Sequence, residues 1–271
     1  MNGLAGRVAI VSGSGNGIGR AAALKLASAG AAVVINDLDP AAAQAVADEI
    51  VAGGGRALAC AGNVVEPGFA ERFVAAAIDG LGGLDIIVNN AGYARHGMVQ
   101  NTPDELFDAM IDVHLTAPFR LLRAAAPFIR SAAKREAAAG GGHHRKVVNV
   151  SSGSIRGAIG HSGYAAGKMG LVGLTNVIAS EWGPSRVNVN AVAFGLIRTR
   201  MNAPLAEGET RNETVLGAPV VMGMTPERFA DVESRNHFGR AGTPEEAAGA
   251  IYLFCTPESD FITGQLIYVS G

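Results

Sequence analysis

A tyrosine and a lysine lie four residues apart in the glycine-rich stretch SSGSIRGAIGHSGYAAGKMG, residues 151–170. If this segment is helical, the spacing places the phenol of Tyr164 and the ammonium of Lys168 on one face, about one turn apart. A nearby cation favours phenolate, so Lys168 is predicted to lower the pKa of Tyr164 from its reference value of about 10. Such a tyrosine can exchange a proton with an alcohol or carbonyl oxygen, and a nearby serine hydroxyl could hold that oxygen. The alternative is a packing tyrosine beside a solvated lysine.

A glycine-rich turn near the start of the chain has the context of a dinucleotide site. The apolar run at residues 8–11 leads into SGSGNGIGR, residues 12–20, and an Ala/Leu-rich segment follows to residue 29. In a strand–turn–helix unit, glycines let the backbone approach a pyrophosphate, and the helix N-terminus supplies free N–H groups. An ordinary glycine-rich loop is the alternative.

An aspartate follows the next apolar run. Asp37 lies 24 residues after Gly13, close to the offset of about 20 residues at which an acidic side chain meets the adenosine ribose. A carboxylate there binds the 2′-hydroxyl and repels a 2′-phosphate. Because no Lys or Arg lies in the turn before Arg20 or closely after Asp37, NAD is predicted in preference to NADP. The alternative is that Asp37 only caps the helix opening at Pro40.

Apolar runs without alternation recur along the chain and are separated by helical segments. This order predicts an α/β fold with a doubly wound (Rossmann), mostly parallel seven-stranded sheet covered by helices on both faces. The predicted strands are residues 8–11, 31–36, 57–60, 84–88, 147–150, 186–192 and 265–269. Without repeats, residues 1–271 are expected to form a single domain, with the irregular apolar segment 200–240 as a substrate-binding lid.

Two further segments carry specific expectations. A long helix is predicted from Thr102 to about Glu136, kinked or interrupted at Pro118 and Pro127. Residues 137–144 are expected to be an exposed loop. Its histidine pair, residues 143–144, is read as solvated, and no metal site is predicted because nothing nearby completes a ligand set.

Composition restricts the class of protein. With 48% hydrophobic and 17% charged residues among 271, the chain can bury a large core. A net charge of −2 gives no reason to expect nucleic acid or an anionic membrane as partner. Cys60 and Cys255 lie in apolar contexts and are expected to be reduced core residues. The N-terminal apolar run is too short for a signal or membrane segment, so a soluble cytoplasmic protein is expected.

Taken together, these features resemble the short-chain dehydrogenase/reductase family, including its NAD-dependent and 3-oxoacyl reductase-like members, over essentially the whole chain. The matching motifs are Ser12-Gly13 with Gly17-Ile18-Gly19, Asn89–Gly92, Tyr164 with Lys168, Asp37, Asn63-Val64, and Thr263–Gln265. The resemblance implies cofactor contacts from Gly13, Asn16, Gly17, Ile18, Gly19, Asp37, Asn63, Val64, Asn90, Ala91, Gly92, Tyr164, Lys168, Gly195, Ile197 and Thr199.

The resemblance also implies the catalytic roles. Tyr164 would be the general acid/base, Lys168 would hold the nicotinamide ribose, and a serine would position the substrate oxygen. Ser152 is favoured because it lies three residues after Asn149 at the strand end. The family's spacing to the tyrosine would instead select Ser151, and Ser154 is a more distant candidate.

The chain departs from the family pattern at two positions. The family's fourth catalytic residue, an asparagine, falls on His114. A histidine could supply the same backbone carbonyl, join the proton relay through its imidazole, or be a plain helix-face residue. The proline usual after the sixth strand is Phe194, which could alter the nicotinamide pocket around Ile197 and Thr199.

The expected function is therefore an oxidoreductase that transfers a hydride between NAD(H) and a secondary alcohol or ketone. The apolar lid favours a largely hydrophobic small-molecule substrate. The alternative is an NAD(H)-binding sensor or regulator of the same fold with little catalysis. By resemblance alone, the protein is expected to be a homotetramer or homodimer.

Overall fold

The computed structural model describes residues 3–206, 209, 211–215 and 217–271 of the protein. Seven strands form one sheet in the order β3-β2-β1-β4-β5-β6-β9, and every neighbouring pair is parallel. This is the doubly wound sheet predicted from the sequence. The order reverses between β1 and β4, so the crevice where such sheets bind ligands lies at the carboxyl ends of these two strands.

The strands of this sheet are Val8–Val11 (β1), Ala32–Ile35 (β2), Ala57–Ala59 (β3), Ile86–Asn89 (β4), Arg145–Ser152 (β5), Val187–Phe194 (β6) and Leu266–Val269 (β9). The helices are Gly17–Ser28 (α1), Pro40–Ala52 (α2), Phe69–Leu81 (α3), Asp104–Ile111 (α4), Ala117–Ala138 (α5), Ser162–Trp182 (α6), Pro226–Ser234 (α7) and Pro244–Leu253 (α8). None of the helices in the described ranges is long and apolar enough to span a bilayer.

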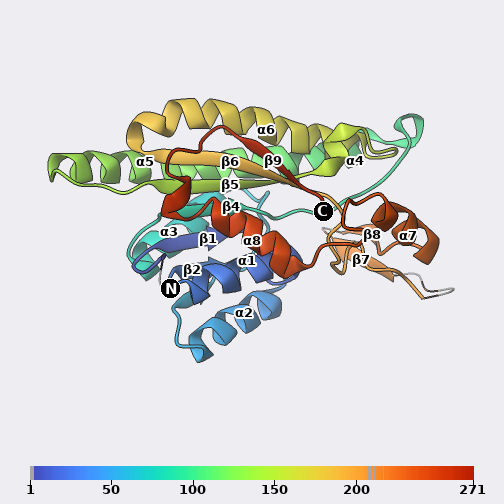
Figure 1. Ribbon diagram of the computed structural model, residues 1–271, viewed down its shortest axis with the longest axis horizontal. Helices are drawn as coiled ribbons and strands as arrows, with labels where there is room; N and C mark the ends of the chain where they lie inside the picture. Colours follow the sequence, from blue (N-terminus) through green and yellow to red (C-terminus); the bar gives the residue numbers. More distant parts are fainter. Residues whose placement is uncertain (1–2, 207–208, 210, 216) are drawn as a thin grey trace.

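Helices cover both faces of the sheet. In Figure 1, α5 and α6 run along one side of the strands, and α1, α2 and α8 lie on the other. Alternate side chains of each strand enter the two cores: Ala9 and Val11 pack with α1, α2 and α8, whereas Val8 and Ile10 pack with α3, α5 and α6. Because both faces are buried, the strands are apolar throughout, as their sequences indicate.

The predicted long helix is interrupted at one place only. A π-helical turn, Asp112–Thr116, separates α4 from α5. Pro118 lies in the first turn of α5, where a missing N–H costs nothing. Pro127 lies inside α5, which continues as one helix through it. Of the expected kink or interruption at Pro127, the interruption was therefore wrong. The helix is interrupted instead by the π turn, a feature often found at functional sites.

The segment after β6 contains regular structure that the sequence analysis missed. Two short strands, Arg211–Val215 (β7) and Ala218–Met222 (β8), pair as an antiparallel hairpin, and α7 follows. In Figure 1 the hairpin and α7 lie together near the C-terminus. The ends of the segment meet, because Ile197 forms a parallel bridge with Gly242.

The histidine pair at the end of α5 is not a solvated loop. His143 Nε2 lies 2.5 Å from Asp85 Oδ1, and His144 Nδ1 lies 2.9 Å from Asn188 Oδ1. Both imidazoles are only partly exposed. The pair therefore fixes this connection against the amino-terminal ends of β4 and β6, which pattern reading could not show because the partners are distant in sequence.

Candidate active site

Strand β5 and helix α6 bring the predicted catalytic side chains together. Ser152 is the last residue of β5, and its hydroxyl is a hydrogen-bond partner of the Tyr164 phenol. Ser151 points the other way, because its Oγ donates to the backbone oxygen of Lys168, 3.1 Å away, inside the protein. Since alternate residues of a strand face opposite sides, only one of the two adjacent serines can face the crevice. Ser154 Oγ accepts a hydrogen bond from Ser152 Oγ at 3.2 Å.

Lys168 is held below the tyrosine. Its Nζ donates to the backbone oxygen of Val150 at 2.6 Å and lies 5.8 Å from the centre of the Tyr164 ring. The side chain is almost fully buried, with 4% exposed. The helical spacing thus places both groups on one face of α6, as predicted.

The electrostatic expectation for this pair was wrong for the free protein. Burial lowers the pKa of Lys168 to about 7. Burial also raises the pKa of Tyr164, although the hydrogen bond from Ser152 opposes the shift. A lysine that is half neutral at neutral pH cannot stabilise a phenolate fully, so desolvation outweighs the attraction assumed from the sequence. The free protein therefore holds Tyr164 as the neutral phenol.

His114 lies against the other side of Tyr164. Its ring packs edge-on with a centroid distance of 4.8 Å, and the π turn carries it into a site where it is 1% exposed. Nε2 is 2.8 Å from the Tyr93 carbonyl oxygen, which can only accept, so Nε2 carries the proton. Nδ1 is left as a buried acceptor with no partner among the described residues. Burial and the charge of Lys168 hold the pKa of His114 well below its usual value.

The glycine turn between β1 and α1 has no room for side chains at its closest contacts. A Cβ on Gly13 would lie 2.7 Å from Ala91 Cα, and one on Gly19 would collide with the Gly13 carbonyl oxygen. Gly13 and Gly17 also have positive φ, 62° and 56°. Helix α1 begins with neither a side-chain cap at Asn16 nor an acidic residue in its first turn. Its N-terminus therefore fits a pyrophosphate.

Asp37 is attached to this turn. Its Oδ2 accepts a hydrogen bond from the Gly15 N–H at 3.1 Å, and its Oδ1 accepts from the Asp39 N–H at 3.2 Å. Helix α2 is capped by Asp39, whose side chain accepts from the Ala41 N–H. Capping, the alternative role considered for Asp37, therefore belongs to Asp39.

Asn36 is a site residue that the sequence analysis missed. It is fully buried at the end of β2, and its Oδ1 accepts from the Gly13 N–H at 3.1 Å. Its Nδ2 donates to the carbonyl oxygens of Cys60 and Gly62. One amide thus joins the glycine turn to the loop after β3. The available signal was a polar residue directly after a buried apolar strand.

The Asn-Asn-Ala-Gly motif after β4 supports the turn from behind. Asn90 Nδ2 donates to the backbone oxygens of Ser12 and Gly13, each at 2.9 Å. Ser12 Oγ accepts from the N–H groups of Asn90 and Ala91, each at 3.0 Å. The amide nitrogen of Asn90 therefore makes its two hydrogen bonds within the protein. Asn89 is bonded to Asn149 on the neighbouring strand β5 at 2.7 Å.

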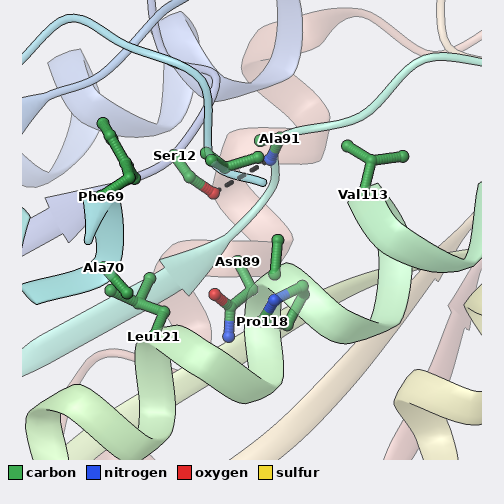
Figure 2. Close-up of a pocket in the computed structure, with 10 residues that line it drawn as sticks. Ser12, Phe69, Ala70, Asn89, Ala91, Val113, Pro118 and Leu121 are labelled. Carbon is green, nitrogen blue, oxygen red and sulfur yellow. Dashed lines mark hydrogen bonds between the residues drawn. The ribbon is translucent and has the colours of Figure 1, made fainter. Parts of the chain in front are cut away.

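A small cavity lies beneath this motif, between the ends of β1 and β4 and helices α3 and α5. Figure 2 shows its lining, with the bond from Ala91 to Ser12 at its edge. Val64 and Ala91, both predicted cofactor residues, line it together with apolar groups such as Val113. It has room for about one water molecule, and Tyr164 does not line it. The cavity therefore lies among the residues that support the site, and it is distinct from the substrate crevice.

Predicted cofactor residues after β3 and after β6 make contacts that place them relative to these elements. Asn63 Oδ1 accepts from the Val65 N–H at 3.1 Å, so its side chain orders the turn after β3. Ile197 is buried. A Cβ on Gly17 would lie 3.6 Å from the Thr199 methyl group, which places the segment after β6 across from the glycine turn. Gly195 packs closely on Ser270.

The chain matches a family model described as "Enoyl-(Acyl carrier protein) reductase" over residues 13–271. The chain belongs to the short-chain dehydrogenase/reductase family. The match covers the glycine turn, the Asn-Asn-Ala-Gly motif, the serine at the end of β5 and the Tyr164–Lys168 pair, so the family is assigned on the residues that form this crevice.

Similar proteins carry names of oxidoreductases. The (2S)-[(R)-hydroxy(phenyl)methyl]succinyl-CoA dehydrogenase subunit BbsD of Thauera aromatica is 32% identical, covering 99% of this chain and 97% of that protein. The 3-oxoacyl-[acyl-carrier-protein] reductase FabG of Vibrio cholerae is 34% identical over 99% and 97%. The crystal structure of a dehydrogenase/reductase from Sinorhizobium meliloti superposes with a TM-score of 0.82 at 30% identity, covering 99% and 95%.

The crevice of this short-chain dehydrogenase/reductase contains the groups needed for oxidoreduction. A phenol, a hydroxyl and an ammonium are grouped at the end of β5 and the start of α6, and an anion-binding turn lies across from them at the end of β1. The residues thus fit a nicotinamide dinucleotide. The crevice lies at the carboxyl ends of β1 and β4, which is the switch point of this doubly wound sheet.

Proposed function

We propose that the protein is an NAD-dependent dehydrogenase/reductase of secondary alcohols and ketones, with a substrate that is largely hydrophobic. The observation that carries the proposal is the grouping of Ser152, Tyr164 and Lys168 on one wall of a crevice whose opposite wall is the glycine turn. The names of the relatives agree with this chemistry, because one contains a secondary alcohol at its hydroxy(phenyl)methyl carbon and the other a ketone at its 3-oxoacyl group.

The preference for NAD rests on Asp37. Its carboxylate is fixed by two backbone N–H groups beside the glycine turn. In that position it can accept a hydrogen bond from a ribose 2′-hydroxyl and repel a 2′-phosphate. Arg20, the first cation after the turn, is paired with Glu49 at 2.6 Å, which leaves it poorly placed to neutralise a phosphate.

The proton chemistry is assigned to Tyr164 and Ser152. When bound, the nicotinamide supplies or accepts the hydride. The neutral phenol of Tyr164 donates a proton to the ketone oxygen during reduction, and the phenolate takes it back during oxidation. Ser152 Oγ holds the same oxygen, which fixes the angle between the reacting carbon and the phenol. Lys168, once charged beside bound ribose hydroxyls, lowers the cost of forming the phenolate.

His114 is proposed as a positioning residue of the proton path. Its unpartnered Nδ1 is a buried acceptor beside Tyr164, and its ring is close enough to Lys168 for the lysine charge to lower the His114 pKa. A water that donates a hydrogen bond to Nδ1 could accept one from the Lys168 ammonium, and would so extend the proton path beyond the lysine. The histidine side chain would then take the place that the family gives to an asparagine backbone carbonyl.

The hairpin supplies the apolar wall of the substrate pocket. Val220 and Met222 are buried against Tyr93, Met110 and Val113. Tyr164 is partly buried against the same cluster. Segment 200–240 is accordingly proposed as the lid over the reacting carbon.

The direct test is an assay of NADH and NADPH oxidation against a panel of ketones and 3-oxoacyl thioesters, with the reverse reaction on the corresponding alcohols. We expect turnover with NADH and a clear preference over NADPH. Binding of NADH without turnover of any carbonyl compound would contradict the assignment as an enzyme. A preference for NADPH would contradict the role given to Asp37.

A further inference from the structure

Two histidines lie side by side close to Tyr164, and the proton chemistry above does not use them. The rings of His96 and His161 are 4.0 Å apart, and the ring of His161 is 5.9 Å from that of Tyr164. His161 directly precedes α6, whereas His96 comes from the loop after β4. The backbone holds them in register, because Gly97 donates to the Gly160 oxygen at 2.9 Å and forms a parallel bridge with His161.

A third basic side chain, from α7, acts on this pair through its charge. Arg228 lies in the first turn of α7 and is exposed. Its charge is close enough to lower the pKa of both imidazoles, in addition to their partial desolvation. No described carboxylate is paired with Arg228 in an ion pair or appears among the groups that shift either imidazole. Two imidazoles and one guanidinium thus lie near one another, with no carboxylate of the described residues ion-paired to them.

We propose that His96, His161 and Arg228 form a binding site for a carboxylate of the substrate, located a few bonds from the carbon that Tyr164 serves. This inference rests on the proposed function, because it names the substrate class of the same crevice. The apolar hairpin would hold the hydrocarbon part, and the basic site would hold the acid. The preferred substrates are then keto acids and the matching hydroxy acids rather than neutral ketones.

The hydrogen bonding of His161 determines how such an acid binds. Its Nδ1 is 3.0 Å from the Ile159 carbonyl oxygen, so Nδ1 carries the proton of the neutral ring. Neutral His161 therefore presents a lone pair at Nε2, which an anion cannot use. A protonated His161 presents an N–H there instead. The carboxylate is accordingly bound together with a proton, which the neighbouring anion stabilises on the imidazole pair.

The charges around the pair set the direction of the pH effect. The groups that face it are His96 and His161 themselves, Tyr164 and Arg228. In the free protein the pKa of each histidine is lowered, so both are neutral near pH 7. Binding a carboxylate raises these pKa values, and its affinity therefore increases as the pH falls.

The test compares phenylacetate, which has no reducible carbonyl, with the neutral phenylacetamide on the full-length protein loaded with NADH. Calorimetry in two buffers with different heats of ionisation measures both affinity and proton uptake. We expect phenylacetate to bind more tightly, with net proton uptake, and its advantage to grow by about tenfold from about pH 8 to about pH 6. Equal affinity for the two compounds, or binding without proton uptake, would overturn the site.

Variants separate the members of the site. Arg228→Gln should reduce the advantage of phenylacetate by about tenfold. Arg235→Gln, directly after the same helix and paired with Asp231 at 2.6 Å, should leave it unchanged. His161→Gln and His96→Gln should each reduce the proton uptake. Turnover is measured separately with γ-keto acids and their methyl esters. Phenylacetate binding without reduction of any ketone would refute the proposed function but not this site. Turnover of the esters with no preference for the acids would refute this site but not the proposed function.

Discussion

The two walls of the crevice differ in how their polar groups are used. On the wall of the glycine turn, Asn36, Asn90 and Asp37 all direct their side chains to backbone groups of the protein. On the wall of Tyr164, the Nδ1 of His114 has no hydrogen-bond partner among the described residues. The His161 ring makes its one hydrogen bond to a described residue through Nδ1, so its Nε2 has none there. The first wall is preorganised around a ligand of fixed shape. The second keeps hydrogen-bonding capacity that water, a substrate or a proton can use.

The largest expected effect is on the second wall. Tyr164→Phe should lower kcat by about a thousandfold, because it removes the proton donor and leaves the ring in place. NADH affinity, measured by fluorescence titration, should change little, since the glycine turn is untouched. Tyr268→Phe is the matched control and should keep full activity. Substantial turnover by the Tyr164 variant would show that the second wall does not supply the proton through this phenol.

The next effect sharpens the role of the first wall. Asp37→Ala should reduce the ratio of kcat/KM for NAD over NADP by about tenfold to a hundredfold, because a charge-assisted hydrogen bond to the ribose is lost. Asp37→Asn tests charge separately, since the amide oxygen can still accept from the Gly15 N–H. Asp39→Ala, which removes only the cap of α2, should affect stability and not the ratio. An unchanged ratio in both Asp37 variants would mean that this carboxylate does not select the cofactor.

A smaller effect is expected at His114. His114→Leu should lower kcat by about tenfold, because the buried acceptor beside Tyr164 is lost. His114→Asn, which restores an acceptor, should recover most of the activity and shift the pH profile of kcat. If both variants match the wild type, the position acts through its backbone alone. Thermal unfolding of each variant checks that the π turn is intact.

The smallest effect concerns stability. Burial lowers the pKa of Lys168 from 10.5 to about 7. Between these values the unfolded chain binds a proton that the folded protein does not, so this residue makes stability rise with pH across that window. Lys168→Met should reduce the slope of Tm against pH within that window by about 3 °C per pH unit. Lys134→Met, at an exposed site on α5, is the control. Identical slopes for all three proteins would show that Lys168 is charged in the free protein.

The sheet could be predicted because its strands are buried on both faces. Runs such as Val8–Val11 and Ala32–Ile35 are apolar throughout and are followed by turn residues. The apolar pattern and the turn residues therefore predict the same strands. The hairpin could not be predicted, because its strands read as irregular apolar sequence. The π turn at Asp112–Thr116 also escaped, since prolines were the only visible cause of an interruption.

The candidate site was predictable in its motifs and not in its electrostatics. The four-residue spacing located Tyr164 and Lys168 on one face of a helix. Their protonation depends on burial, which spacing does not encode, so the direction of the Tyr164 shift was wrong. Strand alternation could have separated Ser151 from Ser152 had the exact end of β5 been known. Asn36 and the His96–His161 pair depend on contacts between distant segments, which no local pattern indicates.

The close approach of Gly15 to Asp37 constrains how this protein could evolve a different cofactor. A Cβ at position 15 would lie 2.6 Å from Asp37 Oδ2 and 2.9 Å from Ala42 Cβ, so any side chain introduced there would have to displace the carboxylate. If Asp37 selects the cofactor as proposed, a substitution of Gly15 should therefore change the nucleotide preference by displacing this carboxylate.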